Sequence, residues 1–207
     1  MRSCKKFFLR FFRFRLNVLR GLLLILFLST FPFPCDALPA TPDLCCKTSP
    51  GALGWSVCFT PGCDCTQFVV QTLGTAQKSV YVQGYGFTSL PIAQALIQAK
   101  ERGVMIQVIL DRSQLHTQYS QLPSLVGAGI PVSIDLISGI AHNKVMIVDE
   151  WQVFTGSFNW TTNAQEKNAE NLLLIKDATL AGFFLKNWQD RHSASQSIEQ
   201  ALEKAKR

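Results

Sequence analysis

Short apolar runs alternate with amphipathic segments along most of this chain, and this alternation restricts its fold more than any other feature. Runs of Val, Ile and Leu bounded by polar residues predict buried strands, whereas apolar residues at three- and four-residue spacing predict helices. The expected strands are 55–61, 79–87, 104–111, 130–135, 144–150, 151–157 and 169–176, and the expected helices are 63–77, 90–103 and 178–193, with a short helix or turn at 120–129. This order predicts an α/β fold with a mixed central sheet and helices on both faces.

Local signals support several of these boundaries. Pro91 suits the first turn of a helix and Gly103 a helix end, while residues 149–151 form the expected turn of a hairpin. The helix at 178–193 is expected to be amphipathic, with one side formed by Leu180, Phe183, Phe184, Asn187 and Trp188.

The first 37 residues differ in kind from the rest. Seven basic residues precede an uncharged stretch of 13 residues, "GLLLILFLSTFPF", which is short for a membrane span of ~20 residues. The small residue Ala37 follows shortly after. We interpret residues 1–37 as a signal peptide cleaved after Ala37, which predicts a secreted or periplasmic protein. The alternative is an uncleaved N-terminal anchor that associates the protein with a membrane.

This leader also explains the positive charge of the chain. It holds seven of the 20 basic and one of the 14 acidic residues, so 13 of each remain after residue 37. The remaining chain is neutral overall. Any polyanion must therefore be bound by a local cluster of basic residues rather than by a broad field.

Five cysteines fall close together after the leader: Cys45, Cys46, Cys58, Cys63 and Cys65. Outside the cytoplasm this grouping favours disulfides, with one thiol left free or paired between chains. A small metal site is the alternative, although the spacing matches no standard zinc pattern. We divide the rest of the chain into a Cys/Pro-rich linker (38–54), a catalytic domain (55–193) and a polar, helix-favouring tail (194–207).

A polar cluster lies around the predicted hairpin. Residues two apart on a strand share a face, so His142 and Lys144 are expected to project together. Gly156, Ser157 and Asn159 follow the neighbouring strand, whose end lies beside the start of the first. A lysine charge, side-chain donors and a glycine that permits close approach suit a phosphoryl group.

The spacing of these residues resembles the phospholipase D superfamily through its motif HxKxxxxDxxxxxxGSxN. His142, Lys144, Asp149, Gly156, Ser157 and Asn159 fill all six fixed positions. Over residues 55–192 the chain looks like the small members that carry one motif per chain, the bacterial periplasmic endonucleases and the mitochondrial cardiolipin hydrolase. Residues 38–54 lie outside this resemblance.

The resemblance implies a phosphodiesterase that uses no metal or other cofactor. His142 would attack phosphorus to form a phosphohistidine, while a second histidine protonates the leaving oxygen. Lys144, Ser157 and Asn159 would bind the phosphoryl oxygens, and Glu170 would orient the His142 ring. Asp149 is assigned a structural role. Because one chain carries one such motif, the resemblance implies a homodimer with a composite active site.

The substrate stays open between nucleic acid and phospholipid, and a binding module without activity is a third possibility. A nuclease would need local cations, for which Lys144, Arg112 and Lys167 are candidates. Four aromatic residues are candidates for stacking on bases or for the core: Tyr85, Phe87, Phe158 and Trp160. His116 and His192 are not expected to be catalytic, although the loop of His116 is a candidate border of the cleft.

Overall fold

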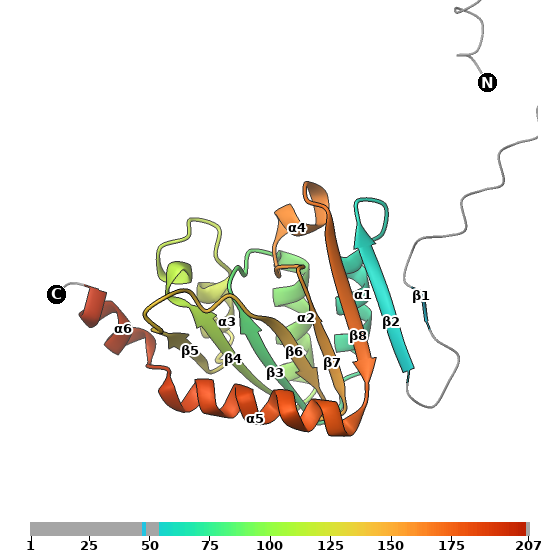
Figure 1. Ribbon diagram of the computed structural model, residues 1–207. Helices are drawn as coiled ribbons and strands as arrows, with labels where there is room; N and C mark the ends of the chain where they lie inside the picture. The colour runs from blue at the N-terminus through green and yellow to red at the C-terminus, as the bar shows by residue number, and fades with distance from the viewer. Residues whose placement is uncertain (1–46, 49–53, 206–207) are drawn as a thin grey trace, which may run out of the picture. The chain divides into compact units, whose positions relative to one another are not determined.

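A computed structural model describes residues 47–48 and 54–205, which form one mixed sheet of eight strands in the order β1-β2-β8-β7-β6-β3-β4-β5 (Figure 1). The strands are β1 (Lys47–Thr48), β2 (Gly54–Thr60), β3 (Ser79–Gly84), β4 (Met105–Asp111), β5 (Val132–Asp135), β6 (Lys144–Val148), β7 (Gln152–Gly156) and β8 (Glu170–Lys176). The helices are α1 (Cys65–Gly74), α2 (Leu90–Glu101), α3 (Leu122–Gly127), α4 (Thr162–Glu166), α5 (Ala178–Ala194) and α6 (Ile198–Ala205), with a 3₁₀ turn η1 at Arg112–Leu115.

The sheet has a parallel half and an antiparallel half. Strands β3, β4 and β5 run parallel and are joined through α2 and α3, as parallel strands require a crossover connection. Strands β6, β7, β8 and β2 run antiparallel, and β6 pairs with β3. This order brings the ends of β3, β4, β7 and β2 to the same edge as the starts of β6 and β8.

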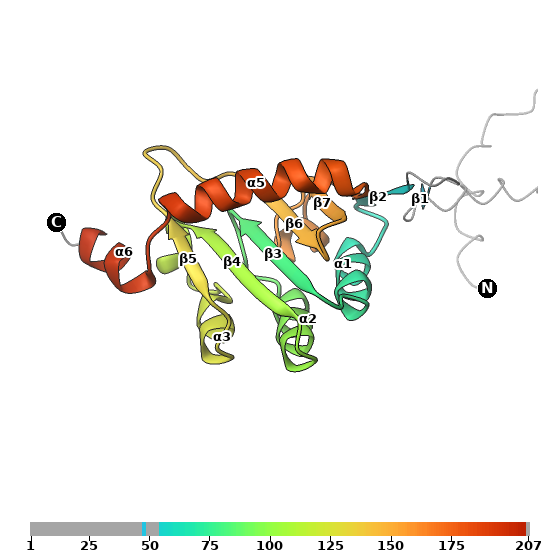
Figure 2. The same cartoon turned by 90° about the horizontal axis from the view of Figure 1, so that it is seen from below.

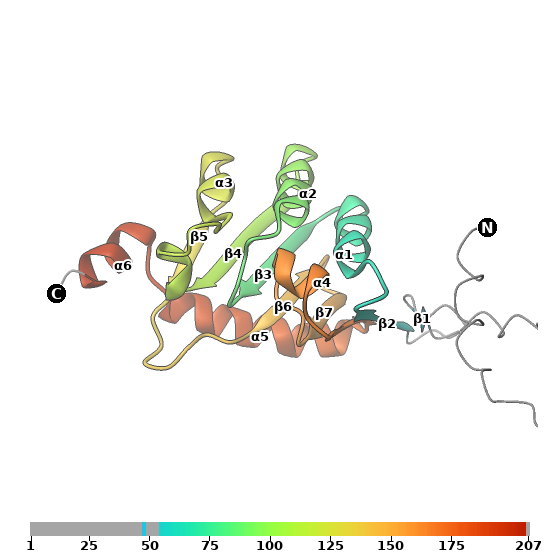
Figure 3. The same ribbon diagram turned by 90° about the horizontal axis from the view of Figure 1, so that it is seen from above.

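Helices cover both faces of the sheet, which confirms the predicted α/β architecture. The larger core packs α1, α2 and α3 against one face, and α5 crosses the other face (Figures 2 and 3). The β6 strand is buried along its whole length because it lies in the middle of this sandwich. The strands therefore read as apolar runs rather than as alternating patterns.

Helix α5 packs on the sheet through only part of the side that the sequence predicts. Ala181 and Trp188 are buried, with Phe184 and Leu185 packed beside them, whereas Phe183 is 71% exposed. Trp188 also donates from Nε1 to the carbonyl of Val82, at 2.9 Å. Phe184 and Trp188 of the expected side are thus confirmed as packing on the sheet, whereas Phe183 and Asn187 are exposed and were wrongly included.

The C-terminal region forms more structure than a polar tail. Helix α6 lies within residues 194–207 and packs on β5 and η1 through the buried Ala201. Before it, Gln196 and Ile134 exchange two backbone hydrogen bonds, of 2.8 and 3.0 Å. This bridge fixes the segment to the edge of the sheet at β5.

The cysteines are partly accounted for. Cys58 on β2 and Cys65 at the start of α1 form a disulfide inside the domain, and Cys63 between them is buried as a free thiol. Cys65 therefore cannot serve as a zinc thiolate in the alternative metal site. Cys45, Cys46 and the predicted leader at residues 1–37 lie outside the described residues. Within residues 47–48 and 54–205, no helix is both long enough and apolar enough to span a bilayer.

Candidate active site

The predicted site residues come from three segments that meet at one edge of the sheet. Lys144 opens β6 opposite Gly84, the last residue of β3. Ser157 and Asn159 follow β7, and Glu170 opens β8. Because Gly156 pairs with Leu172, the end of β7 lies beside the start of β8.

His142 lies in the loop before β6 and not on the strand itself. Its backbone N–H donates to the carbonyl of Ile140 at 3.0 Å, so the chain turns just before the strand begins. The expected projection from a common strand was therefore wrong in its detail. His142 and Lys144 nevertheless approach the same ring, that of Tyr85. The His142 ring centroid lies 4.7 Å from the Tyr85 centroid, and Lys144 Nζ lies 5.3 Å from it.

Lys144 is a buried cation, with only 6% of its surface exposed. Its Nζ donates to the carbonyl of His142 at 2.7 Å, which ties the two motif residues together. Burial lowers the pKa of Lys144, and the nearby Glu170 carboxylate acts in the opposite direction. A cation held in this way is preorganised to bind a negative group at the sheet edge.

Ser157 and Glu170 form a hydrogen-bonded pair between β7 and β8. Ser157 Oγ donates to Glu170 Oε2 at 2.5 Å and accepts from the Asn171 N–H at 3.0 Å. Glu170 Oε1 accepts from Asn168 Nδ2 at 2.8 Å. Both carboxylate oxygens thus have partners here, and the orienting bond from Glu170 to the His142 ring stays a prediction.

Asn159 has a buried side-chain oxygen, Oδ1, without a hydrogen-bond partner. Buried polar atoms are rarely left unpaired, so this one marks a position where a donor is missing. A phosphoryl oxygen cannot fill it, because both oxygens are acceptors, and the predicted contact of Asn159 with a phosphoryl group would use its Nδ2 group. Asn159 follows the end of β7, where the chain leaves the sheet.

Gly156 is needed at the end of β7 for two reasons. Its φ of +148° is unfavourable for residues with a side chain, and an added Cβ would lie 2.4 Å from the carbonyl oxygen of Asn171. The absence of a side chain thus allows β7 and β8 to pair up to the residue that precedes Ser157.

Asp149 lies at the opposite end of β6 from the other motif residues. Asp149 and Glu150 both have positive φ, as the two central residues of a type I′ turn do, and the Trp151 N–H donates to the carbonyl of Val148 across this turn. The Asp149 carboxylate accepts hydrogen bonds from the backbone N–H groups of Gln77, Lys78 and Ser79. It therefore joins the hairpin turn to the start of β3.

Three of the four aromatic residues proposed for base stacking are core residues. Phe87, Phe158 and Trp160 are fully buried, which confirms the core alternative for these three residues and excludes base stacking by them. Trp160 packs against Gly84, where an added Cβ would lie 3.0 Å from the indole. The burial of these rings supports the chain that carries Asn159. Tyr85 alone among them is partly exposed, and it packs against His142.

Arg112, Lys167 and His192, which the sequence analysis also considered, lie in three different parts of the structure. Arg112 donates from Nη2 to the carbonyls of Ser138 and Gly139, in the loop that leads to His142. Lys167 is exposed at the end of α4. His192 stacks on Trp188 at 4.8 Å, on the face of the sheet covered by α5.

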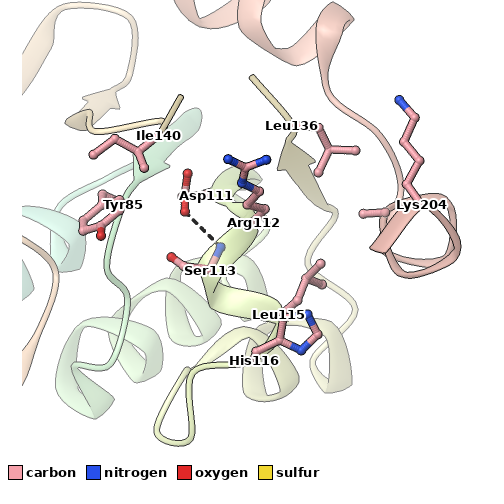
Figure 4. Close-up of a pocket in the computed structure, with 10 residues that line it drawn as sticks. Tyr85, Asp111, Arg112, Ser113, Leu115, His116, Leu136, Ile140 and Lys204 are labelled. Atoms are coloured by element: carbon pink, nitrogen blue, oxygen red, sulfur yellow. Dashed lines mark hydrogen bonds between the residues drawn. The ribbon is translucent and has the colours of Figure 1, made fainter. Parts of the chain in front are cut away.

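A pocket of about 560 Å³ adjoins the site through Tyr85 (Figure 4). Arg112, His116 and Lys204 contribute basic groups to its lining, and Leu115, Leu136 and Ile140 contribute apolar ones. The loop of His116 thus borders the cleft. The sequence carried no motif for this pocket, because its walls come from segments distant along the chain.

Comparison with known proteins identifies the family. A family model described as "Cardiolipin synthase, PLD-like domain" matches residues 69–191. The chain belongs to the phospholipase D-like family. A protein named Phospholipase D from Rickettsia prowazekii is 48% identical over 143 residues, covering 69% of this chain and 70% of that protein. The Mitochondrial cardiolipin hydrolase of Xenopus laevis is 36% identical over 124 residues, covering 60% and 59%.

Two solved structures share the fold. Nuc from Salmonella typhimurium, a phospholipase D family member, is 33% identical with a TM-score of 0.67, covering 73% of this chain and 99% of Nuc. NucT from Helicobacter pylori is 25% identical with a TM-score of 0.63, covering 70% and 98%. The phospholipase D-like chain described here is thus a phosphodiesterase, a hydrolase of phosphodiester bonds.

Proposed function

We propose that this protein is a metal-independent endonuclease that cleaves nucleic acid through a phosphohistidine at His142. The observation that carries the proposal is the meeting of His142, Lys144, Ser157, Asn159 and Glu170 at one sheet edge, from three separate segments. A nucleophile, a buried cation and polar side chains in one place suit a phosphodiester better than a neutral substrate.

The reaction proceeds in two displacements. A nitrogen of the His142 ring bonds to phosphorus as the bond from phosphorus to the leaving oxygen breaks, and an imidazolium gives that oxygen its proton. The same imidazole, now neutral, takes a proton from water, whose oxygen then displaces His142 from phosphorus. Lys144 neutralises negative charge on the phosphoryl oxygens in both steps, and the Asn159 amide N–H groups help to position them.

The second imidazole comes from another copy of the chain. Among the described residues, His142 is the histidine that lies with the motif residues, since His116 lines the neighbouring pocket and His192 packs on Trp188. A two-fold axis beside this edge supplies the second protomer's His142. The proposed active form is therefore a homodimer with one shared site.

Nucleic acid is the preferred substrate class in this proposal. The resemblance to Nuc and NucT and the basic groups beside the site support it. The names of the Rickettsia and Xenopus relatives favour a second candidate, hydrolysis of membrane phospholipids. The basic and apolar residues of 1–37 support secretion or a membrane tether for either activity.

The test is a substrate panel with EDTA present throughout. Plasmid DNA, single-stranded RNA and phospholipid vesicles are incubated with the wild-type protein and with His142→Ala. We expect nucleic acid to be cleaved by the wild type alone. Cleavage of lipid alone would overturn the nuclease in favour of the phospholipase, and a requirement for added metal would contradict the phosphohistidine mechanism.

A further inference from the structure

The pocket beside the active site is built from segments outside the motif. Tyr85 separates it from His142 and Lys144, since its ring contacts both of them and also lines the pocket. Asp111, Arg112 and His116 come from the end of β4 and from η1 with the residue after it, and Ala201 and Lys204 come from α6. A substrate bound at His142 that extends past Tyr85 therefore enters this pocket.

Helix α6 gives the pocket a wall from outside the residues that the family model matches. The match to that model ends at residue 191, whereas α6 covers Ile198–Ala205. The wall is held in place by the backbone bridge between Ile134 and Gln196. A few residues before Gln196, the Arg191 guanidinium forms a bidentate ion pair with the buried Asp135 carboxylate of β5. These contacts hold the segment that leads into α6, and so this wall of the pocket, against β5.

The lining combines positive charge with apolar surface. Arg112, His116 and Lys204 line the pocket together with the apolar side chains of Leu115, Leu136 and Ile140, the last of which is drawn near Tyr85 (Figure 4). The acidic residue in the lining, Asp111, is 2% exposed, and its carboxylate accepts from the backbone N–H groups of Ser113 and Ala141. Its charge is therefore engaged by the protein, and the pocket offers cations to a ligand.

We infer that this pocket binds the nucleotide next to the scissile phosphate, with the neighbouring phosphate on Lys204 and His116 and the sugar and base on Leu136 and Ile140. The inference rests on the proposed nuclease function. Lys144 and Asn159 already serve the reacting phosphate, so the additional positive charge of Arg112 and Lys204 calls for a second phosphate. Polynucleotides carry one at every residue, whereas a phospholipid with a single phosphate would leave Lys204 without a partner.

Equilibrium binding tests the inference without relying on turnover. In a His142→Ala background, the affinity for a fluorescein-labelled single-stranded oligonucleotide is measured by anisotropy from 50 to 200 mM NaCl, with and without Lys204→Ala. We expect weaker binding and a slope of log affinity against log salt that is shallower by about 0.7 for each lost phosphate contact. Lys78→Ala is the matched control, because Lys78 is exposed beside Asp149 at the opposite end of the sheet.

Every outcome decides the inference. A Lys204→Ala variant that matches Lys78→Ala in affinity and salt slope overturns it. Binding only to vesicles of phosphatidylcholine and cardiolipin, and not to the oligonucleotide, also overturns it in favour of a lipid. Turnover of bis(p-nitrophenyl) phosphate by the wild type reports separately on the phosphodiesterase chemistry. A failure of that reaction would not change the binding result, which tests the pocket by itself.

Discussion

Replacing Asp149 by alanine should destabilise the fold while leaving the chemistry intact. The carboxylate accepts hydrogen bonds from three consecutive backbone N–H groups at residues 77–79, and all of them lose their partner in the variant. Alanine must also adopt a φ of +52°, which Asp tolerates better. The site residues at the other end of β6 keep all of their own contacts.

The magnitude follows from these contacts. Hydrogen bonds to a charged group contribute roughly 1.5–3 kcal/mol each when buried, and water replaces part of this at the exposed Gln77 and Lys78. We therefore expect the free energy of unfolding to fall by about 2–4 kcal/mol in total. For a domain of this size the melting temperature should fall by roughly 5–15 °C. Asp149→Asn keeps the shape and one acceptor oxygen, so its loss should be smaller.

The assay combines thermal unfolding followed by circular dichroism with turnover of bis(p-nitrophenyl) phosphate, measured well below both melting temperatures. The reasoning predicts a lower melting temperature and a kcat within a few-fold of the wild type. A loss of kcat of about 10²-fold or more at an unchanged melting temperature would instead make Asp149 part of the catalytic machinery.

Three further predictions concern other parts of the site and its support. Gly156→Ala should lower the free energy of unfolding by at least ~2 kcal/mol, because of backbone strain and the clash with β8. The control Gly182→Ala, which has open space around it in α5, should raise the free energy of unfolding by ~0.5–1 kcal/mol. Equal melting temperatures of the two variants would contradict this prediction. Glu170→Gln should shift the alkaline limb of kcat/KM to lower pH, because Glu170 raises the pKa of Lys144 against the effect of burial, and an unchanged limb would refute that coupling. Replacing both cysteines of the β2–α1 disulfide by serine should lower the free energy of unfolding by about 2–3 kcal/mol, since the bond joins residues seven apart. An unchanged midpoint in chemical denaturation would contradict this value.

The elements that were predictable from sequence are those with a strong period or a clear boundary. The apolar runs of β4, β6 and β8 were predicted because local chemistry specifies them, and so was helix α2, with Pro91 in its first turn and Gly103 shortly after its end. The short helix α4 and the two-residue strand β1 were not expected, because tertiary pairing and a Thr161 cap, rather than periodicity, produce them.

The site shows the same division between local and distant information. The motif spacing led to His142, Lys144, Ser157 and Asn159, since a hairpin brings two strand ends together whatever surrounds them. Tyr85 as the contact of His142, and the wall formed by α6, depend on pairings between residues far apart in the chain. Burial of Phe87, Phe158 and Trp160 likewise follows from packing that no local pattern reveals.

The proposed pairing of two His142 residues in one site is tested most directly by mixed dimers. Wild-type and His142→Ala chains carrying different tags are co-refolded in known ratios, and turnover is measured against the mutant fraction. If each site needs both imidazoles, activity falls with the square of the wild-type fraction, to about a quarter in an equal mixture. A linear decline, with about half of the activity left in that mixture, would show that each protomer works with its own histidine and would contradict the composite site.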